Sequence, residues 1–207
     1  MNQKGVITDS IKEPGLSIHF VDLGLSVKWG SCNIGASNPI DFGNYFAWGE
    51  TETKKVFSWE TYNNLASYTR DEQIAELDIN KDVANIKLGG NWRIPSVNDF
   101  NELLHHCTWI WTKIKGVAGY KVTSKEKGFT DNYIFLPAAG YIDNETSSGI
   151  GSFGAYWSRT IAKDYSLGAN YLYLNSDASG ITDYYRRCGH SIRPVYIENN
   201  NNENNYE

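Results

Sequence analysis

Tryptophan, glycine and proline recur at the joints of six phrases along the chain, and this recurrence restricts the fold more than any other feature. The phrases are VDLGLSVKWGSCNIGA (Val21–Ala36), YFAWGET (Tyr45–Thr51), GGNWRIPSVNDFNELL (Gly89–Leu104), IFLPAAGY (Ile134–Tyr141), GAYWSRT (Gly154–Thr160) and GHSIRPV (Gly189–Val195). Glycine and proline punctuate turns, and a buried indole removes a large apolar area from water. The pattern indicates long irregular loops attached to a small core.

The length of 207 residues suits one domain with a full-sized core, which we expect over residues 17–197. We expect a flexible lead-in over 1–16 and a disordered asparagine-rich tail over 198–207, because neither can bury much apolar surface. The net charge of -5 gives no basic footprint for nucleic acid. No apolar run is long enough to span a membrane. The first 15 residues lack the apolar region of a signal peptide, so the protein either stays inside the cell or follows a removed leader.

Hydrophobic periodicity predicts two helices. Residues 81–88 carry apolar side chains at helical spacing and stop at Gly89-Gly90, where glycine adopts a left-handed cap with little strain. Residues 97–107 carry a clear apolar stripe, and Ser96 with Asp99 resembles a capping box. A further helical turn is predicted near residues 72–77.

Strand-like segments fill most of the remaining chain. Asp22-Leu23-Gly24 predicts a hairpin turn that joins residues 17–21 to residues 25–29. The other predicted strands are Thr108–Ile114, Gly119–Ser124, Tyr133–Leu136, Tyr156–Thr160, Asn170–Leu174 and Tyr184–Tyr196. Residues 143–152 are polar and contain glycine, which predicts a loop. Strands followed by two helices and a further run of strands indicate an α+β fold with a small, mostly antiparallel sheet.

The order of the six phrases resembles the Fibrobacter succinogenes major paralogous domain, a family common in surface proteins of gut Bacteroidetes. The match runs from about Val21 to Val195 and is carried by VDLGLSVKW, WRIPS, FLPAAGY, YWSRT and SIRPV. The family looks like a branch of the C-type-lectin-like folds, near the formylglycine-generating sulfatase-modifying proteins. The resemblance implies two helices packed on a mixed sheet, with long loops that carry a binding surface.

The resemblance also implies a biological setting. From the resemblance we expect this chain to be displayed on a cell surface or a phage particle, where it would bind a protein or a glycan on a host or neighbouring cell. Some domains of this branch are the variable proteins of diversity-generating retroelements, in which the stretch that matches residues 155–190 here is rewritten while the frame stays constant. For this chain the resemblance therefore predicts a non-enzymatic recognition module used in adhesion.

Residue chemistry points to the same stretch as a binding surface. Tyrosine and arginine provide large amphipathic contact areas and are enriched in binding hot spots. The candidate ligand-binding residues are Tyr156, Arg159, Tyr171, Tyr173, Asp183, Tyr184, Tyr185, Arg186, Arg187 and His190. Strand alternation predicts that Leu172 and Leu174 face the core, whereas Tyr171 and Tyr173 face outward. The alternative is that the tyrosines only occupy a solvent-exposed face of the sheet, because strands favour aromatic residues.

Trp29, Trp48, Trp92 and Trp157 lie beside glycine or proline in the six phrases. They could form an exposed platform for sugars, but anchoring loops to the core is the better interpretation. Replacing one of them by alanine should then cost about 3–5 kcal/mol of stability.

Metal chemistry has weak support in the sequence, and we expect no cofactor. Calcium is the ligand that a lectin-like fold suggests, and residues 143–145 (Asp-Asn-Glu) offer oxygen ligands. The resembling calcium-dependent branch carries Glu-Pro-Asn or Gln-Pro-Asp and then Trp-Asn-Asp, which this sequence lacks, so a solvated turn is favoured. His105, His106 and Cys107 point in different directions on a helix and cannot easily chelate one ion.

An enzymatic alternative is centred on Cys188. The formylglycine-generating relatives resemble a pattern with two reactive cysteines near the carboxy terminus, and here Cys188 has no second cysteine close by. Cys32, Cys107 and Cys188 have apolar or aromatic neighbours, which favours buried thiols, although a single Cys32–Cys107 bridge stays open. The remaining alternative is a structural spacer of a surface assembly.

Overall fold

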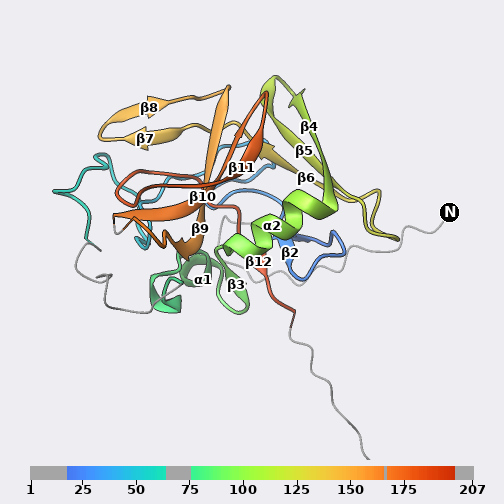
Figure 1. Cartoon of the computed structure of the whole chain (residues 1–207), viewed down its shortest axis with the longest axis horizontal. Coiled ribbons are helices and arrows are strands. Elements are labelled where there is room, and N and C mark those ends of the chain that lie inside the picture. The colour runs from blue at the N-terminus through green and yellow to red at the C-terminus, as the bar shows by residue number, and fades with distance from the viewer. Residues whose placement is uncertain (1–17, 64–75, 166, 199–207) are drawn as a thin grey trace, which may run out of the picture.

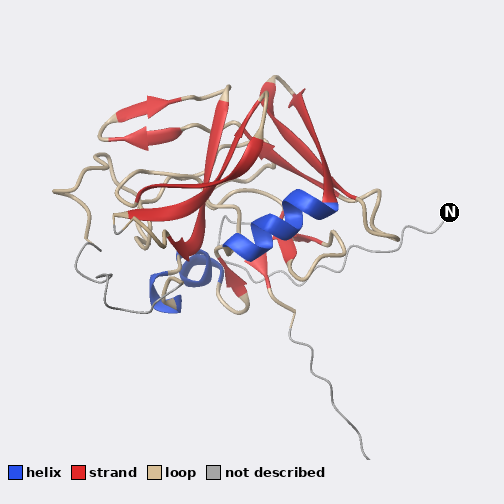
Figure 2. Cartoon of the chain, viewed as in Figure 1, coloured by secondary structure: helices blue, strands red, loops and turns tan. Residues whose placement is uncertain are grey.

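The structure is a computed structural model, and it describes residues 18–63, 76–165 and 167–198. Figures 1 and 2 show few helices and several small sheets joined by long loops. The described ranges contain two α-helices, and their named strands pair in antiparallel fashion. The predicted α+β class is confirmed, but the strands form several small sheets instead of one. The predicted lead-in, residues 199–207 of the tail and residues 72–75 lie outside the described residues.

One small sheet brings together strands from both ends of the described chain. Its order is β1 (Phe20–Val21), β2 (Lys28–Gly30), β12 (Val195–Tyr196) and β3 (Trp92–Arg93). The predicted pairing of the first two strands is correct, although both strands are shorter than predicted. Leu23 and Val27 in their connection are buried in the core, so this segment leaves the ladder to fill the interior.

Both predicted helices are present. Helix α1 (Val83–Leu88) starts two residues later than predicted, because η2 (Ile79–Lys81) is a 3-10 turn and Asp82 caps the helix. Gly89 ends α1 with a φ of 72°. Helix α2 (Val97–His106) has the predicted capping box between Ser96 and Asp99. Cys107 is the first residue of the following strand instead of the last of the helix.

Two three-stranded sheets and one hairpin make up the rest of the strand structure. One sheet has the order β4 (Cys107–Ile114), β5 (Val117–Ser124) and β6 (Tyr133–Pro137). The other has the order β11 (Ser179–Tyr185), β10 (Gly168–Asn175) and β9 (Phe153–Ile161). The hairpin consists of β7 (Tyr141–Asp143) and β8 (Thr146–Ser148) and projects at the upper left of Figure 1.

Two local predictions are wrong, and a third is described only in part. Residues 143–152 are not all loop, because Asn144 adopts a left-handed φ of 53° and turns the chain between β7 and β8. The strand predicted over 184–196 ends at Tyr185, because the following residues form single bridges with separate segments, such as Phe46 with His190 and Ile142 with Gly189. Only residues 76 and 77 of the helical turn predicted near residues 72–77 are described, and there Glu76 forms a single antiparallel bridge with Thr160.

The β9–β10–β11 sheet lies between two apolar cores. On β10, Leu172 and Leu174 face the core that contains Phe100 and Leu103 of α2. The alternate residue Tyr171 faces the second core, which contains Trp48 and other residues far away in sequence. The inward position of the two leucines is confirmed. The outward position of Tyr171 is wrong, because the second face of the sheet is also covered.

The four tryptophans of the sequence phrases are buried, as the anchoring interpretation predicts. Trp29, Trp48, Trp92 and Trp157 are at most 7% exposed. The indole of Trp48 donates a 2.8 Å hydrogen bond to the carbonyl of Ser158, and that of Trp157 donates one of 2.8 Å to the carbonyl of Phe46. These bonds fix the 46–48 loop on β9.

No helix in the described ranges is both long and apolar enough to cross a membrane.

Candidate functional site

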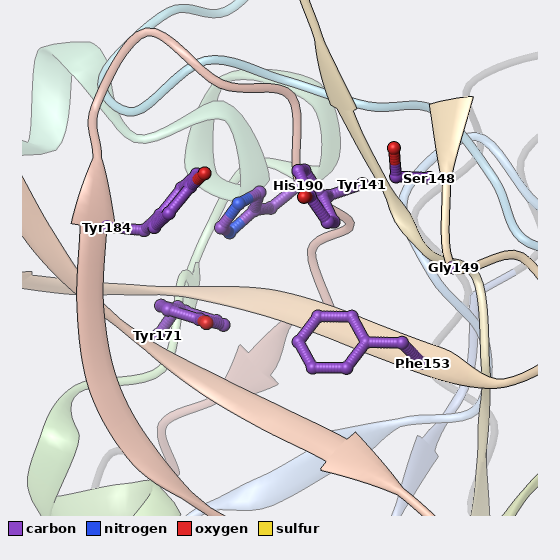
Figure 3. A pocket seen from close by; sticks show the side chains of 7 residues that line it. All are labelled: Tyr141, Ser148, Gly149, Phe153, Tyr171, Tyr184 and His190. Atoms are coloured by element: carbon purple, nitrogen blue, oxygen red, sulfur yellow. The ribbon is translucent and has the colours of Figure 1, made fainter. Parts of the chain in front are cut away.

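An aromatic pocket of about 370 Å³ lies on the side of the β9–β10–β11 sheet that faces away from Leu172 and Leu174. Its lining residues are Tyr141, Ser148, Gly149, Phe153, Tyr171, Tyr184 and His190 (Figure 3). The volume lies within the range of small-ligand sites. The pocket is partly open to solvent, so a ligand can enter without unfolding of the frame.

Each wall of the pocket comes from a different element. Tyr141 lies on β7, Phe153 begins β9, Tyr171 is on β10 and Tyr184 is on β11. Gly149, with a φ of 73°, turns the chain after β8, and a Cβ there would lie 2.7 Å from the Cβ of Phe153. Glycine at this position therefore permits Phe153 to reach the pocket.

The four six-membered rings form a chain of edge contacts around the central space. Tyr141 lies 6.1 Å from Phe153 and 5.8 Å from Tyr184, with interplanar angles of 75° and 71°. Tyr184 and Tyr171 follow at 6.3 Å and 67°. Figure 3 shows these rings on different sides of the space, with His190 between Tyr141 and Tyr184. Ring faces with different orientations thus converge on one volume.

His190 closes the inner side of the pocket. Its imidazole stacks on Trp157 at 3.8 Å between ring centroids and is 1% exposed. Burial lowers the pKa of His190 to about 3, so the ring is neutral near pH 7. Its Nδ1 atom is buried and has no hydrogen-bond partner among the described residues.

The phenols of Tyr171 and Tyr184 are also neutral near pH 7. Burial, followed by the influence of Tyr184, raises the pKa of Tyr171 to about 12. Burial, followed by the influence of Tyr141, raises the pKa of Tyr184 to about 12. Two carboxylates add to these effects, since Asp183 acts on Tyr171 and Asp143 acts on Tyr184. Tyr171 and Tyr184 therefore present uncharged rings to the pocket.

Arg187 ties the β7–β8 hairpin to the rest of the molecule. Its guanidinium forms an ion pair with both carboxylate oxygens of Asp143 and donates a 2.9 Å hydrogen bond to the carbonyl of Phe57. It also lies 5.3 Å from the ring centroid of Tyr185 and 5.8 Å from that of Trp59. This pairing disfavours calcium at the predicted turn, because the carboxylate of Asp143 already faces a cation.

Three candidate residues from the sequence lie in the pocket: Tyr171, Tyr184 and His190. Two others are interior, which corrects their predicted role in surface binding. Tyr156 is fully buried and donates a 2.6 Å hydrogen bond to the carbonyl of Pro137, and Arg186 is 1% exposed beside the Trp48 ring. The stretch predicted to form the binding surface, residues 155–190, also contributes to the second core. Some of its side chains are therefore buried in the interior and others are exposed.

The remaining candidates lie around the pocket or away from it. Tyr173 and Tyr185 are partly exposed, and Asp183 is exposed. Arg159 has a structural role, since its Nη2 donates a 2.8 Å hydrogen bond to the carbonyl of Leu77 and its Nε lies 3.2 Å from a Glu76 carboxylate oxygen. Reasoning from the sequence did not identify Tyr141 and Phe153 as site residues. The sequence feature that could have identified them is a pair of aromatic residues on either side of a polar, glycine-containing turn.

All three cysteines are buried free thiols, in agreement with the favoured interpretation. Burial, followed by the influence of Asp143, raises the pKa of Cys188 to about 12. A thiol with so high a pKa is a poor nucleophile at neutral pH. The histidines before Cys107 point to separate partners, with His105 contacting the carbonyl of Asn101 at 2.6 Å and His106 contacting Glu126 at 2.7 Å.

Comparison with protein-family models, with curated proteins and with solved structures gave no match. The site is therefore interpreted from its own chemistry.

Proposed function

We propose that the chain is a non-enzymatic ligand-binding module. The observation that carries this proposal is the aromatic pocket, which collects residues from β7, β9, β10 and β11 and from the segment after Tyr185. Concave sites with apolar walls and a few polar groups are the usual form of ligand sites in proteins. The buried indoles and helices supply a rigid frame behind it.

The proposal includes the C-type-lectin-like fold and a protein or glycan ligand, and both rest on the ordered sequence phrases. It also includes display on a cell surface or a phage particle. If a diversity-generating retroelement acts on this chain, a near-duplicate of the coding segment for residues 155–190 should lie beside a reverse transcriptase gene. We expect variation at exposed positions such as Asp183, whereas buried Tyr156 and Arg186 should stay constant.

A cysteine-dependent enzyme is the weaker alternative, because the raised pKa of the buried Cys188 disfavours a thiolate. The two functions differ in a thiol-reactivity titration of the folded protein near pH 7. Modification of Cys188 much more slowly than of a free thiol supports the binding module. Rapid, stoichiometric modification would favour the enzyme.

The binding proposal is tested by glycan arrays and by pull-down from host-cell lysate, with paired variants. Tyr184→Ala with Tyr185→Ala removes two partly exposed rings of β11. Tyr133→Ala on β6 is the control, since Tyr133 is 45% exposed and is not among the residues that line the pocket. We expect at least a tenfold loss of capture in the double variant and no change in the control. Equal capture by all three proteins would contradict the proposed face, and blank assays would favour the spacer.

A further inference from the structure

The geometry of the pocket favours a compact ligand over a flat one. Planar aromatic ligands stack on one broad exposed face. Here Tyr184 meets Tyr141 and Tyr171 at interplanar angles of 71° and 67°, and Phe153 adds a fourth wall. A roughly spherical group at the centre can contact several ring faces at once (Figure 3).

The electrostatics of the pocket favour a positive charge. Aromatic faces are negative because of the ring quadrupole, and they attract cations within about 6 Å of the centroid. The buried His190 is neutral near pH 7 and does not repel a cation. Asp143 and Arg187 form an ion pair and largely cancel each other, so the carboxylate of Asp183, which acts on Tyr171, is the remaining charge near the pocket phenols.

The cost of dehydration distinguishes primary ammonium groups from quaternary ammonium groups. A primary ammonium group loses strong hydrogen bonds to water on entry, and the few polar groups here, such as the Ser148 hydroxyl and the phenols, replace them incompletely. A quaternary ammonium group has no N–H to satisfy. Aromatic cages of this kind recognise such cations in proteins.

We infer that the pocket bounded by Tyr141, Phe153, Tyr171 and Tyr184 binds a quaternary ammonium group, such as the trimethylammonium of choline. This inference rests on the proposed ligand-binding function and specifies the chemical class of the ligand.

The first test compares two probes of nearly equal shape by calorimetry on the full chain. Choline carries the cation, and 3,3-dimethylbutan-1-ol replaces its nitrogen by carbon and is neutral. We expect saturable binding of choline that is at least about tenfold tighter than binding of the neutral analogue, because the ring faces attract the positive charge through cation–π interactions. Equal affinities, or no saturable binding of choline, would overturn the inference whatever the behaviour of any variant.

The second test locates the site. Tyr184→Leu keeps an apolar side chain but removes a ring face, and we expect it to weaken choline binding at least about fivefold. Tyr133→Leu on β6 makes the same chemical change outside the pocket and should leave the affinity unchanged. Proton NMR spectra of both variants check that the fold is retained. Equal choline affinity in a folded Tyr184→Leu protein would place the binding elsewhere and contradict the inference.

The inference and the proposed function fail in different ways. If choline does not bind but the paired β11 variants lose glycan or protein capture, the cage is wrong and the module remains a binding protein. If choline binds and the arrays and pull-downs are blank, the ligand is a small cation and the proposed macromolecular ligand is wrong.

Discussion

The guanidinium of Arg193 connects three distant parts of the chain. It is fully buried and donates hydrogen bonds of 2.8–3.0 Å to the Asn33 side chain and to the carbonyls of Gly30, Ser31 and Phe135. A planar fork with five donors can satisfy these acceptors together, which a lysine ammonium cannot. The arginine of the phrase SIRPV therefore has a structural role, because it joins distant segments inside the molecule. The sequence shows the phrase, but it does not show acceptors that lie up to 163 residues away.

The buried His190 predicts a dependence of stability on pH. Its pKa is about 3 in the folded protein and about 6.5 when unfolded, so between these values the unfolded state binds more protons. Its contribution to stability is complete above about pH 6.5 and declines as the pH falls towards 3. Between about pH 7.5 and 5 this residue should lower the free energy of unfolding by about 2 kcal/mol. Urea denaturation at both pH values measures the difference.

The matched variant for this prediction is His190→Phe, which keeps a ring against Trp157 but cannot take up a proton. It should lose about 2 kcal/mol less than the wild type over the same pH interval, whatever its stability at pH 7.5. An NMR titration of the wild type gives an independent check, because the His190 imidazole should stay neutral down to about pH 4. An identical pH dependence in both proteins, or an imidazole that titrates near pH 6.5, would show that His190 is accessible to water.

At the scale of single elements, helix α1 depends on its N-cap. The Asp82 carboxylate accepts hydrogen bonds from the amides of Ala84 and Asn85 and also from the amide of Ile94. It therefore caps the helix and holds the strand-to-helix connection that leads to α2. We expect Asp82→Ala to destabilise the protein by about 2–4 kcal/mol, through loss of the cap and burial of an unpaired amide. Thermal or urea denaturation measures this change.

Asp78→Ala provides the control for Asp82→Ala. Asp78 caps the short η2 turn through a 2.8 Å hydrogen bond from the Asn80 amide, but it is exposed. Its loss should cost less than about 1 kcal/mol, because water replaces the lost hydrogen bond. Similar losses in both variants would mean that burial of Asp82 adds nothing to its capping role.

Local signals explain which elements could be predicted from the sequence. The stripe and capping box of α2 depend on residues within one or two turns, so the prediction over residues 97–107 nearly matches Val97–His106. The exposure of Tyr171 depends on what covers the second face of β10. The covering residues include Phe46 and Ile192, which are far away in sequence. Strand alternation separates two faces but cannot say that both are buried.

The same reasoning applies to the candidate site at the scale of the whole molecule. The sequence placed Tyr171, Tyr184 and His190 in a binding stretch, because tyrosines cluster there. It missed Tyr141 and Phe153, because their place in the pocket depends on tertiary contacts, such as the pairing of β7 with β8 and the ring contact between the two residues. Residue chemistry thus indicated the region, and tertiary contacts decided which side chains face one space.

The arrangement of the two cores predicts that the described part of the chain unfolds as one unit. Strands β9 and β10 contribute alternate side chains to both cores, so neither core can open without disturbing the other. Leu172→Ala in one core and Ile192→Ala in the other should each cost about 2–5 kcal/mol. Each should shift the whole urea transition to lower concentration with an unchanged slope. Ile110→Ala, at a side chain that is 54% exposed, should change stability by less than about 1 kcal/mol.

Two probes distinguish a single unit from two separate ones. Tryptophan fluorescence reports on Trp29 in the first core and on Trp48 and Trp157 in the second, whereas far-ultraviolet circular dichroism reports on the backbone. Coincident transitions in the wild type and in both core variants support the shared sheet as the link between the cores. If Ile192→Ala shifts only one part of a biphasic curve, the second core and its aromatic pocket form an independent folding unit. The pocket would then rest on a frame that can open locally, and its rings would lack the fixed geometry on which recognition of a compact cation depends.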